Sequence, residues 1–110
     1  MLSIVATPIG NLEDITMRAL RILKEVDYIL CEDTRVTSRL LARYEIQKPL
    51  KRYDAHTSEH VHSSIIEDLE NGKHIALVSD AGTPGISDPG VMLIQQAREA
   101  GIAIEVIPGP

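Results

Sequence analysis

The sequence is short of aromatic residues and of cysteine. It has no tryptophan, no phenylalanine and one cysteine, Cys31, among 110 residues. A single cysteine excludes an internal disulfide and is typical of a reducing compartment, so we expect a cytoplasmic protein. Aromatic residues make up 3% and hydrophobic residues 44%, which predicts an aliphatic core. Cys31 lies in a strand-like run, which favours a core position over a nucleophile.

Long apolar runs and positive charge are also scarce. No apolar stretch approaches the roughly 20 residues that a membrane-spanning helix needs. The 11 Lys and Arg residues stand against 16 Asp and Glu residues, for a net charge of −5. This balance disfavours a surface dedicated to nucleic acid, although it leaves room for a local basic strip. A chain of 110 residues allows one small domain and is too short for two.

Nucleotide-binding fingerprints are missing from the first loop, Thr7–Asp14. It contains neither G-x-G-x-x-G nor a Walker-type lysine, which disfavours a dehydrogenase or a P-loop NTPase. Pro8 and Gly10 in this loop could form a wall beside a ligand. A capped turn between a strand and a helix explains the same residues, and the sequence leaves both interpretations open.

Strand-like and helical patterns alternate along the whole chain. The predicted strands are 2–6, 27–31, 50–53, 74–78 and 102–107. The predicted helices are 16–26, 37–44, 58–71 and 89–100, with Asp14 or Thr16 as the first cap and Gly72 and Gly101 as helix stops. This pattern predicts an α/β fold: an open, mainly parallel five-stranded sheet with helices on both faces, in three layers.

Right-handed crossovers would place all strand-to-helix loops on one edge of this sheet, where ligands bind in open α/β folds. These loops are 7–15, 32–36, 54–57 and 79–88, and residues 108–110 follow the fifth strand on the same edge.

The segment Ser79–Gly90 is the most informative of these loops. It holds three glycines and two prolines, so we expect it neither to continue the strand nor to start a helix early. Its carboxylates, Asp80 and Asp88, suit hydroxyls and cationic groups better than phosphates. Twelve residues exceed what a turn needs, which favours a binding site over the alternative of an ordinary long connection.

The second loop holds the polar run Glu32-Asp33-Thr34-Arg35. Glu32 or Asp33 could accept a proton, and the planar fork of Arg35 could bind a phosphate or a carboxylate. The alternative is a capped helix start, with acidic residues near its positive end.

His56 and His60 are spaced for a metal only if both are helical, and His56 precedes the predicted helix. We therefore expect no metal, and we expect His56 to contact substrate from the ligand edge. Lys48, Lys51 and Arg52 form a small basic group that we expect to face solvent.

Four motifs in order carry a family resemblance: residues 5–16 (VATPIGNLEDIT), 31–35 (CEDTR), 78–90 (VSDAGTPGISDPG) and 108–110 (PGP). Together the chain resembles the tetrapyrrole (corrin/porphyrin) methylase superfamily, and within it the branch that methylates ribosomal RNA. The resemblance implies methyl transfer from S-adenosylmethionine to the ribose 2′-hydroxyl of a cytidine in 16S ribosomal RNA of the small ribosomal subunit. It also implies a homodimer, and a cofactor cleft shared with a second domain. Residues 1–110 would then be the amino-terminal domain, and we expect it to be inactive alone.

The resemblance also implies roles for individual residues. On the cofactor side we expect Asp80, Ala81, Gly82, Thr83, Pro84, Asp88 and Pro108. On the substrate side we expect Pro8, Gly10, Asn11, Thr34, Arg35 and His56. The candidate catalytic residues, which the sequence does not rank, are Glu32, Asp33 and Asp80.

Two rival functions stay open from the sequence. A tetrapyrrole (precorrin/uroporphyrinogen) C-methyltransferase of the same superfamily would bind a porphyrinoid, but such members usually carry a Gly-rich G-x-G-P-G first loop. The chain has Thr7-Pro8-Ile9-Gly10-Asn11 there instead. A non-catalytic nucleotide- or phosphate-binding α/β module would need no second domain. With a net charge of −5, we expect most of the basic surface for RNA to come from a second domain or a dimer partner.

Overall fold

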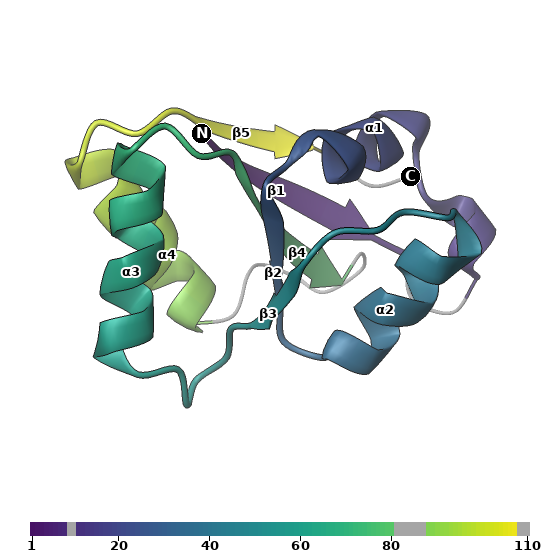
Figure 1. Cartoon of the computed structure of the whole chain (residues 1–110), viewed down its shortest axis with the longest axis horizontal. Helices are drawn as coiled ribbons and strands as arrows, with labels where there is room; N and C mark the ends of the chain where they lie inside the picture. The colour runs from purple at the N-terminus through teal and green to yellow at the C-terminus, as the bar shows by residue number, and fades with distance from the viewer. Residues whose placement is uncertain (9–10, 81–87, 108–110) are drawn as a thin grey trace.

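A single sheet of five strands runs through the molecule (Figure 1). The structure, a computed structural model, describes residues 1–8, 11–80 and 88–107, with the side chains of Asp80, Asp88 and Pro89 outside that description. The strands are β1 (Leu2–Thr7), β2 (Tyr28–Cys31), β3 (Leu50–Arg52), β4 (Ile75–Asp80) and β5 (Ile104–Ile107). Their order across the sheet is β3-β2-β4-β1-β5, and each neighbouring pair is parallel.

Helices cover both faces of this sheet, so the three-layer α/β prediction is confirmed. The helical elements are η1 (Leu12–Asp14), α1 (Met17–Glu25), α2 (Thr34–Arg43), α3 (Glu59–Glu70) and α4 (Asp88–Glu99). In Figure 1, α1 and α2 lie on one side of the sheet and α3 and α4 on the other. The side chains of Thr16, Asp33 and Ser58 each accept a backbone hydrogen bond at the start of α1, α2 and α3, respectively.

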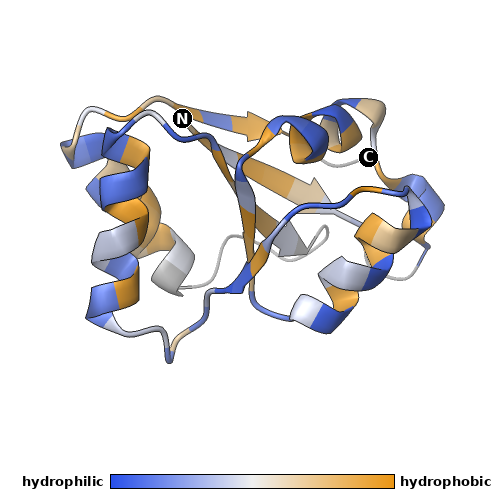
Figure 2. Ribbon diagram, in the orientation of Figure 1, coloured by the Kyte–Doolittle hydropathy of each residue, from blue (hydrophilic) through white to orange (hydrophobic). Residues whose placement is uncertain are grey.

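Two aliphatic clusters, one on each face of the sheet, hold the layers together. Alternate residues of one strand belong to different clusters, since Val5 of β1 packs with α1 and α2 while Ile4 packs with α3 and α4. Figure 2 shows the central strands mostly in hydrophobic colours. Cys31 is buried at 1% exposure, which confirms its predicted core position. Within the described part of the chain, no helix is long and apolar enough to span a bilayer.

The register brings the carboxyl ends of the central strands together. β1 pairs with β4 from Leu2 opposite Ile75 to Thr7 opposite Asp80. The helices that follow β1 and β2 lie on one face, and those that follow β3 and β4 lie on the other. Because β4 lies between β2 and β1, strands that are neighbours in the sheet are followed by helices on opposite faces. Crevices between such connections are where ligands bind in open α/β sheets.

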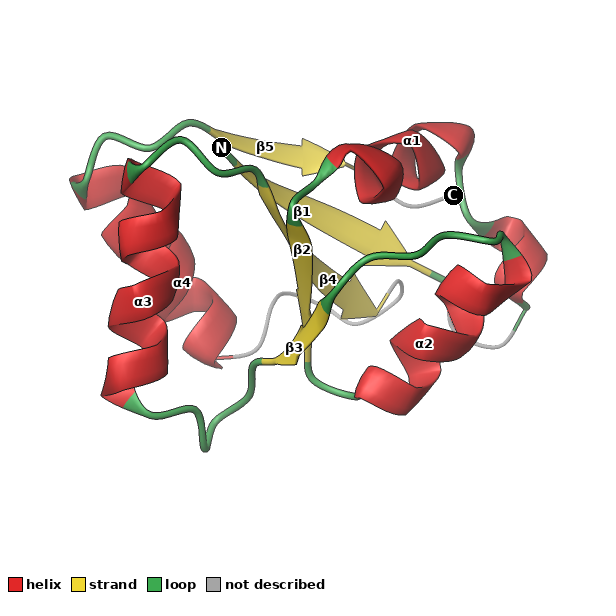
Figure 3. Cartoon of the chain, viewed as in Figure 1, coloured by secondary structure: helices red, strands yellow, loops and turns green. Residues whose placement is uncertain are grey.

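Figure 3 shows the observed helices and strands, and several of their boundaries differ from the sequence prediction. Helix α2 begins at Thr34 and not at Thr37, because the Asp33 side chain caps it from within the predicted loop. Strand β4 continues two residues beyond its predicted end, to Asp80, because β1 is long enough to pair with it there. The prediction that the segment from Ser79 does not continue the strand is therefore wrong for its first two residues.

The last two elements also shift. Helix α4 already begins at Asp88, one residue before its predicted start at Pro89, and proline is well tolerated in a first helical turn. Strand β5 begins at Ile104, two residues later than predicted. The backbone N–H of Ile102 still closes the end of α4 by donating to the Ala97 carbonyl, and Gly101 adopts φ 75° there.

Candidate functional site at the carboxyl edge of the sheet

The sheet order arranges the carboxyl ends of the five strands in a row along one edge. From β3 to β5, the strands of this row end at Arg52, Cys31, Asp80, Thr7 and Ile107. Adjacent strands lie about 4.8 Å apart, so the Glu32 segment and the Asp80 segment leave the sheet one spacing from each other. The ends of β3 and β5 are the farthest apart, separated by about 19 Å of sheet.

Thr7 and Ser79 join the ends of β1 and β4 at the centre of this row. The buried Thr7 hydroxyl donates a 3.2 Å hydrogen bond to the carbonyl oxygen of Ser79. Pro8, which follows directly, is buried. The bond fixes the starting points of the first loop and of the glycine-rich loop relative to each other. Sequence reasoning missed Thr7 because a threonine at a strand end carries no distinctive pattern.

The described part of the first loop is a capped turn. The Asn11 side chain accepts a 3.0 Å hydrogen bond from the Glu13 backbone N–H and caps η1. The Tyr44 hydroxyl donates to the Leu12 carbonyl at 2.6 Å, which ties the loop to the end of α2. The capping interpretation is therefore confirmed for Asn11, whereas Gly10 lies outside the described residues.

The Glu32–Arg35 run is the start of α2. The Asp33 carboxylate accepts a hydrogen bond from the Arg35 backbone N–H at 3.0 Å and lies 3.7 Å from Nε of Arg35. The backbone hydrogen bond from Arg35 lowers the pKa of Asp33 below its ordinary value. Burial raises the pKa of the neighbouring Cys31 thiol. Glu32 is exposed and makes no hydrogen bond or ion pair with any described residue.

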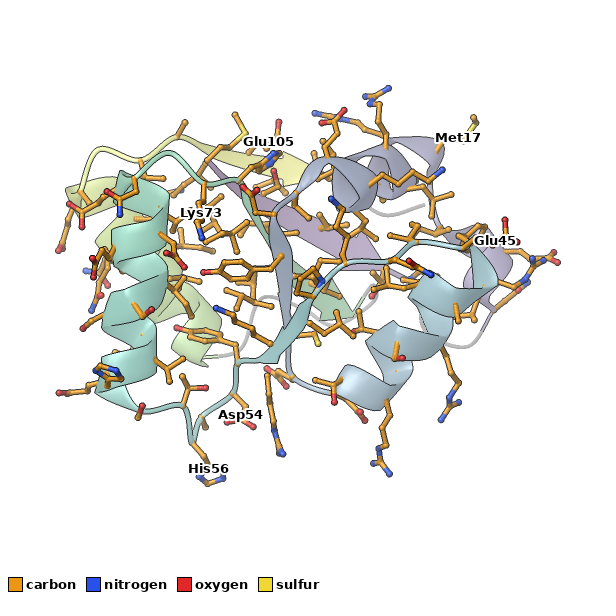
Figure 4. The ribbon with its side chains drawn as sticks, viewed as in Figure 1. Met17, Glu45, Asp54, His56, Lys73 and Glu105 are labelled. Carbon is orange, nitrogen blue, oxygen red and sulfur yellow. The ribbon has the colours of Figure 1, made fainter. Side chains whose placement is uncertain are left out.

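The turn after β3 is organised by Asp54, a residue that sequence reasoning did not single out. Its carboxylate accepts from the His56 backbone N–H at 2.8 Å and from Nε of Arg52 at 2.6 Å, while its own N–H donates to Thr57. The hydrogen bond from His56 is the main cause that lowers the pKa of Asp54. Figure 4 shows the His56 side chain at the tip of this turn, pointing outward. The spacing Asp54-x-x-Thr57 is the signal that would have indicated such a turn.

His62 of α3 takes part in a polar chain that runs from Tyr53, just after β3, to α4. Its Nδ1 lies 2.8 Å from the hydroxyl of Tyr53, and its Nε2 contacts Oε1 of Gln96 in α4. Burial raises the pKa of Tyr53 to about 12. His56 and His60 are exposed, and His56 precedes α3 as predicted. Over residues 1–8, 11–80 and 88–107, no group of three His, Cys, Asp or Glu side chains could hold a metal ion.

The basic group near β3 is only partly as predicted. Lys51 and Arg52 are exposed, whereas Lys48 is half-buried. The ammonium of Lys51 lies 4.0 Å from the centroid of the Tyr28 ring, a cation–π contact.

Much of the predicted cofactor side lies outside the described residues: Ala81, Gly82, Thr83, Pro84 and Pro108. Asp80 ends β4 and Asp88 begins α4, so their backbones lie at the carboxyl edge. A shallow hollow of about 750 Å³ lies instead between the end of α2 and the start of β3, near Glu45 and Pro49, at the opposite edge of the sheet. The described edge therefore offers carboxylates and hydroxyls, which suit a ligand with positive charge and hydroxyl groups.

Two curated relatives are both named "Ribosomal RNA small subunit methyltransferase I". That of Mycoplasmopsis pulmonis is 55% identical over 106 residues, covering 96% of this chain and 48% of the relative. That of Pasteurella multocida is 53% identical over 109 residues, covering 99% of this chain and 39% of the relative. The chain thus spans about half or less of the length of the curated relatives it matches.

The fold is also found among solved structures. The cobalamin biosynthetic enzyme cobalt precorrin-4 methyltransferase superposes with a TM-score of 0.77 at 21% identity, covering 98% of this chain and 45% of that one. This likeness concerns the fold alone. The sequence profile of the Tetrapyrrole (Corrin/Porphyrin) Methylases matches residues 1–110. The chain therefore belongs to the family of tetrapyrrole (corrin/porphyrin) methylases.

Proposed function

We propose that this chain is the amino-terminal domain of an S-adenosylmethionine-dependent methyltransferase that acts on the ribose 2′-hydroxyl of a cytidine in 16S ribosomal RNA. The observation that carries the proposal is the identity of 55% and 53%, over nearly the whole chain, to relatives named for a ribosomal RNA methyltransferase. The working protein would be a cytoplasmic homodimer with a second domain that completes the cleft.

The chemistry of the carboxyl edge fits S-adenosylmethionine, which carries a sulfonium, an ammonium and ribose hydroxyls. Asp80 and Asp88 bring two carboxylates to this edge, at the end of β4 and the start of α4. When bound, S-adenosylmethionine would supply a methyl group that is already electrophilic. Asp80, Ala81, Gly82, Thr83, Pro84, Asp88 and Pro108 are the residues we propose to hold it. The protein's main contribution is then to align donor and acceptor.

Two of the three candidate bases differ in their surroundings. The Asp33 carboxylate is occupied by the α2 cap, and its lowered pKa makes it a weaker proton acceptor. Glu32 is exposed beside it and has no partner among the described residues. We therefore assign Glu32 as the group that takes the proton from the ribose hydroxyl, with Asp80 as the alternative on the next strand.

Substrate would lie along the same edge. Arg35 is 86% exposed at the start of α2, where its guanidinium can bind a phosphate. Thr34, Pro8, Gly10 and Asn11 would line the approach. His56 lies two strand spacings from β4, so it would contact a neighbouring nucleotide rather than the methylated one.

Calorimetric titration with S-adenosylmethionine tests the cofactor assignment. One sample is this chain, and the other is a chimera that joins residues 1–110 to the remainder of the Mycoplasmopsis pulmonis relative. We expect binding by the chimera and weak or no binding by the chain alone. If neither sample binds although circular dichroism shows both to be folded, the methyl-donor site is contradicted and a phosphate-binding module is favoured. Competition between free sulfate and a phosphorylated ligand would reveal such a module.

Methyl transfer tests the substrate. The chimera is incubated with small ribosomal subunits and methyl-tritiated S-adenosylmethionine. We expect label in 16S RNA at a cytidine whose linkage resists alkaline hydrolysis, because 2′-O-methylation blocks that cleavage. Label transferred to a precorrin or uroporphyrinogen and none to RNA would instead support the tetrapyrrole C-methyltransferase.

A further inference from the structure

The net charge of −5 conceals a separation of charge between the two faces of the sheet. On one face, α1 carries Arg18, Arg21 and Lys24 against a single Glu25, and α2 carries three arginines and no acidic residue. The opposite face is acidic, because α3 carries four carboxylates and no Lys or Arg, and α4 adds two carboxylates against one arginine. Helices α1 and α2 therefore sum to +5, from which Glu13 and Asp14 of η1 on the same face subtract two, while α3 and α4 sum to −5.

The three arginines of α2 form a row, here called the arginine stripe: Arg35, Arg39 and Arg43. They are four residues apart, so successive members lie on neighbouring turns, about 6 Å apart along the helix axis. All three are exposed. This spacing is comparable to that of successive phosphates along a nucleic-acid strand.

The stripe is available for a ligand. Arg39 makes no ion pair with any residue that the structure describes. Arg35 contacts Asp33 at 3.7 Å, and Arg43 contacts Glu13 at 3.3 Å, both as solvent-exposed pairs. Exposed pairs of this kind contribute about 0–1 kcal/mol, so a polyanion can displace them.

The direction of α2 links the stripe to the candidate site. Helix α2 follows β2 directly, so Arg35 lies at the carboxyl edge and Arg43 lies toward the opposite edge. Helix α1 covers the same face and adds its own exposed cations. A strand that follows the stripe toward Arg35 arrives at the edge where Glu32 and Asp80 leave the sheet.

We propose that the α1–α2 face binds the phosphate backbone of the RNA substrate, with the arginine stripe as its main contact. This inference rests on the proposed function and assigns an RNA-binding surface to this chain itself. The sequence prediction had instead placed most of the positive charge on a second domain or a dimer partner. Guanidinium groups suit phosphate, and such contacts position an RNA strand without reading its sequence.

The test measures binding of this chain to a fluorescein-labelled single-stranded RNA by anisotropy, at salt concentrations from about 50 to 200 mM. We expect Arg39→Gln to reduce the slope of log affinity against log salt by about 0.7, and the double variant with Arg43→Gln by about twice that. Arg39→Lys should retain the slope, because it keeps the charge. The matched control is Arg98→Gln, which removes an exposed arginine from α4 on the acidic face and should change nothing.

Two further measurements separate this inference from the proposed function. Each variant is checked for an unchanged circular dichroism spectrum, and its chimera with the Mycoplasmopsis pulmonis remainder is titrated with S-adenosylmethionine. Loss of RNA binding with S-adenosylmethionine binding intact supports the inference. An unchanged salt slope in the double variant, or an equal loss of slope in Arg98→Gln, overturns the inference but does not affect the proposed cofactor site. Binding to phosphatidylserine–phosphatidylcholine vesicles with none to RNA also overturns it, in favour of an anionic membrane.

Discussion

The hydroxyl of Thr7 donates to the carbonyl oxygen of Ser79 across 3.2 Å, where β1 and β4 both end. The two residues are 72 positions apart in the chain, and each precedes a loop of the candidate site. Because the Thr7 side chain is buried, the bond is partly shielded from water, and it fixes the ends of β1 and β4 relative to each other.

We expect Thr7→Val to weaken both the fold and the site. The substitution keeps the shape of the side chain but leaves the part-buried Ser79 carbonyl without this donor, which should lower the free energy of unfolding by about 1 kcal/mol. In the chimera, it should also weaken S-adenosylmethionine binding, because both loops lose a common anchor. Urea unfolding and calorimetric titration measure the two effects.

Thr7→Ser is the matched control, since it restores the donor without the methyl group. It should recover cofactor affinity. If Thr7→Val binds as tightly as the unchanged protein, the bond supports the sheet alone and does not organise the site.

A second polar network lies at the opposite edge of the sheet. The Ser3 hydroxyl is fully buried and donates to Oε1 of Glu105 at 2.7 Å, so it accepts from Nε2–H of His74, also at 2.7 Å. This network links β1 with the start of β4 and with β5. We expect Ser3→Ala to lower the free energy of unfolding by about 1–3 kcal/mol, because two partly buried polar groups lose their shared partner.

The control for this prediction is Ser63→Ala, an exposed serine on α3. It should shift the urea midpoint by far less than Ser3→Ala. Equal midpoints for the two variants would show that Glu105 and His74 find water or each other at no cost.

The cap of α2 predicts a dependence of stability on acid. The pKa of Asp33 is lower in the folded protein than its ordinary value of about 3.9, so its ionised form stabilises the fold. This contribution is fully present above the ordinary pKa and is lost as the pH falls from about 4 through the lowered value. Asp33→Asn still caps the helix but has no charge to lose.

We therefore expect the unchanged protein to lose more stability than Asp33→Asn between pH 7 and pH 3, as measured by urea unfolding at both pH values. Asp14→Asn is the control, because the exposed Asp14 side chain makes no hydrogen bond with the described residues. A loss in Asp33→Asn as large as that in the unchanged protein would show that other carboxylates cause the acid sensitivity.

Periodicity and capping residues were enough to predict the architecture. Thr16, Ser58, Gly72 and Gly101 lie where the predicted helices begin or end, and the alternation of strands and helices determined the parallel sheet. The predicted boundaries were wrong where strand pairing or a capping side chain outside the hydrophobic pattern determined where an element begins or ends. The pairing of β4 with β1 as far as Asp80 does not follow from local hydrophobicity, and the cap by Asp33 was predicted only as the alternative interpretation of residues 32–35.

The positions of the strand ends that precede the candidate site were predictable, whereas the side-chain contacts near them were not. The topology places the carboxyl ends of all five strands on one edge, as expected from right-handed crossovers. Two contacts could not be predicted from a local pattern, because they join separate segments of the sequence. They are the bond from Thr7 to Ser79 and the chain from Tyr53 through His62 to Gln96. The separation of charge between the faces was equally hidden, because a net charge averages over helices that face opposite ways.

Glu32 and Asp33 are adjacent carboxylates in different environments, and this difference predicts different kinetic roles. Asp33 is held by the α2 cap, whereas Glu32 is exposed and without a partner in the described part of the chain. In the chimera, we expect Glu32→Gln to lower kcat for RNA methylation by about 10²-fold or more with little change in KM, because a general base acts in the transition state.

Asp33→Asn is the matched control, since it removes the neighbouring charge, keeps the cap and should leave kcat close to that of the unchanged protein. Single-turnover methyl transfer with saturating RNA measures both variants without interference from product release. If Asp33→Asn loses the rate and Glu32→Gln keeps it, the cap residue is the base after all. If both keep it, Asp80 becomes the base, because it is the third carboxylate of the row and leaves the sheet one strand away from Glu32.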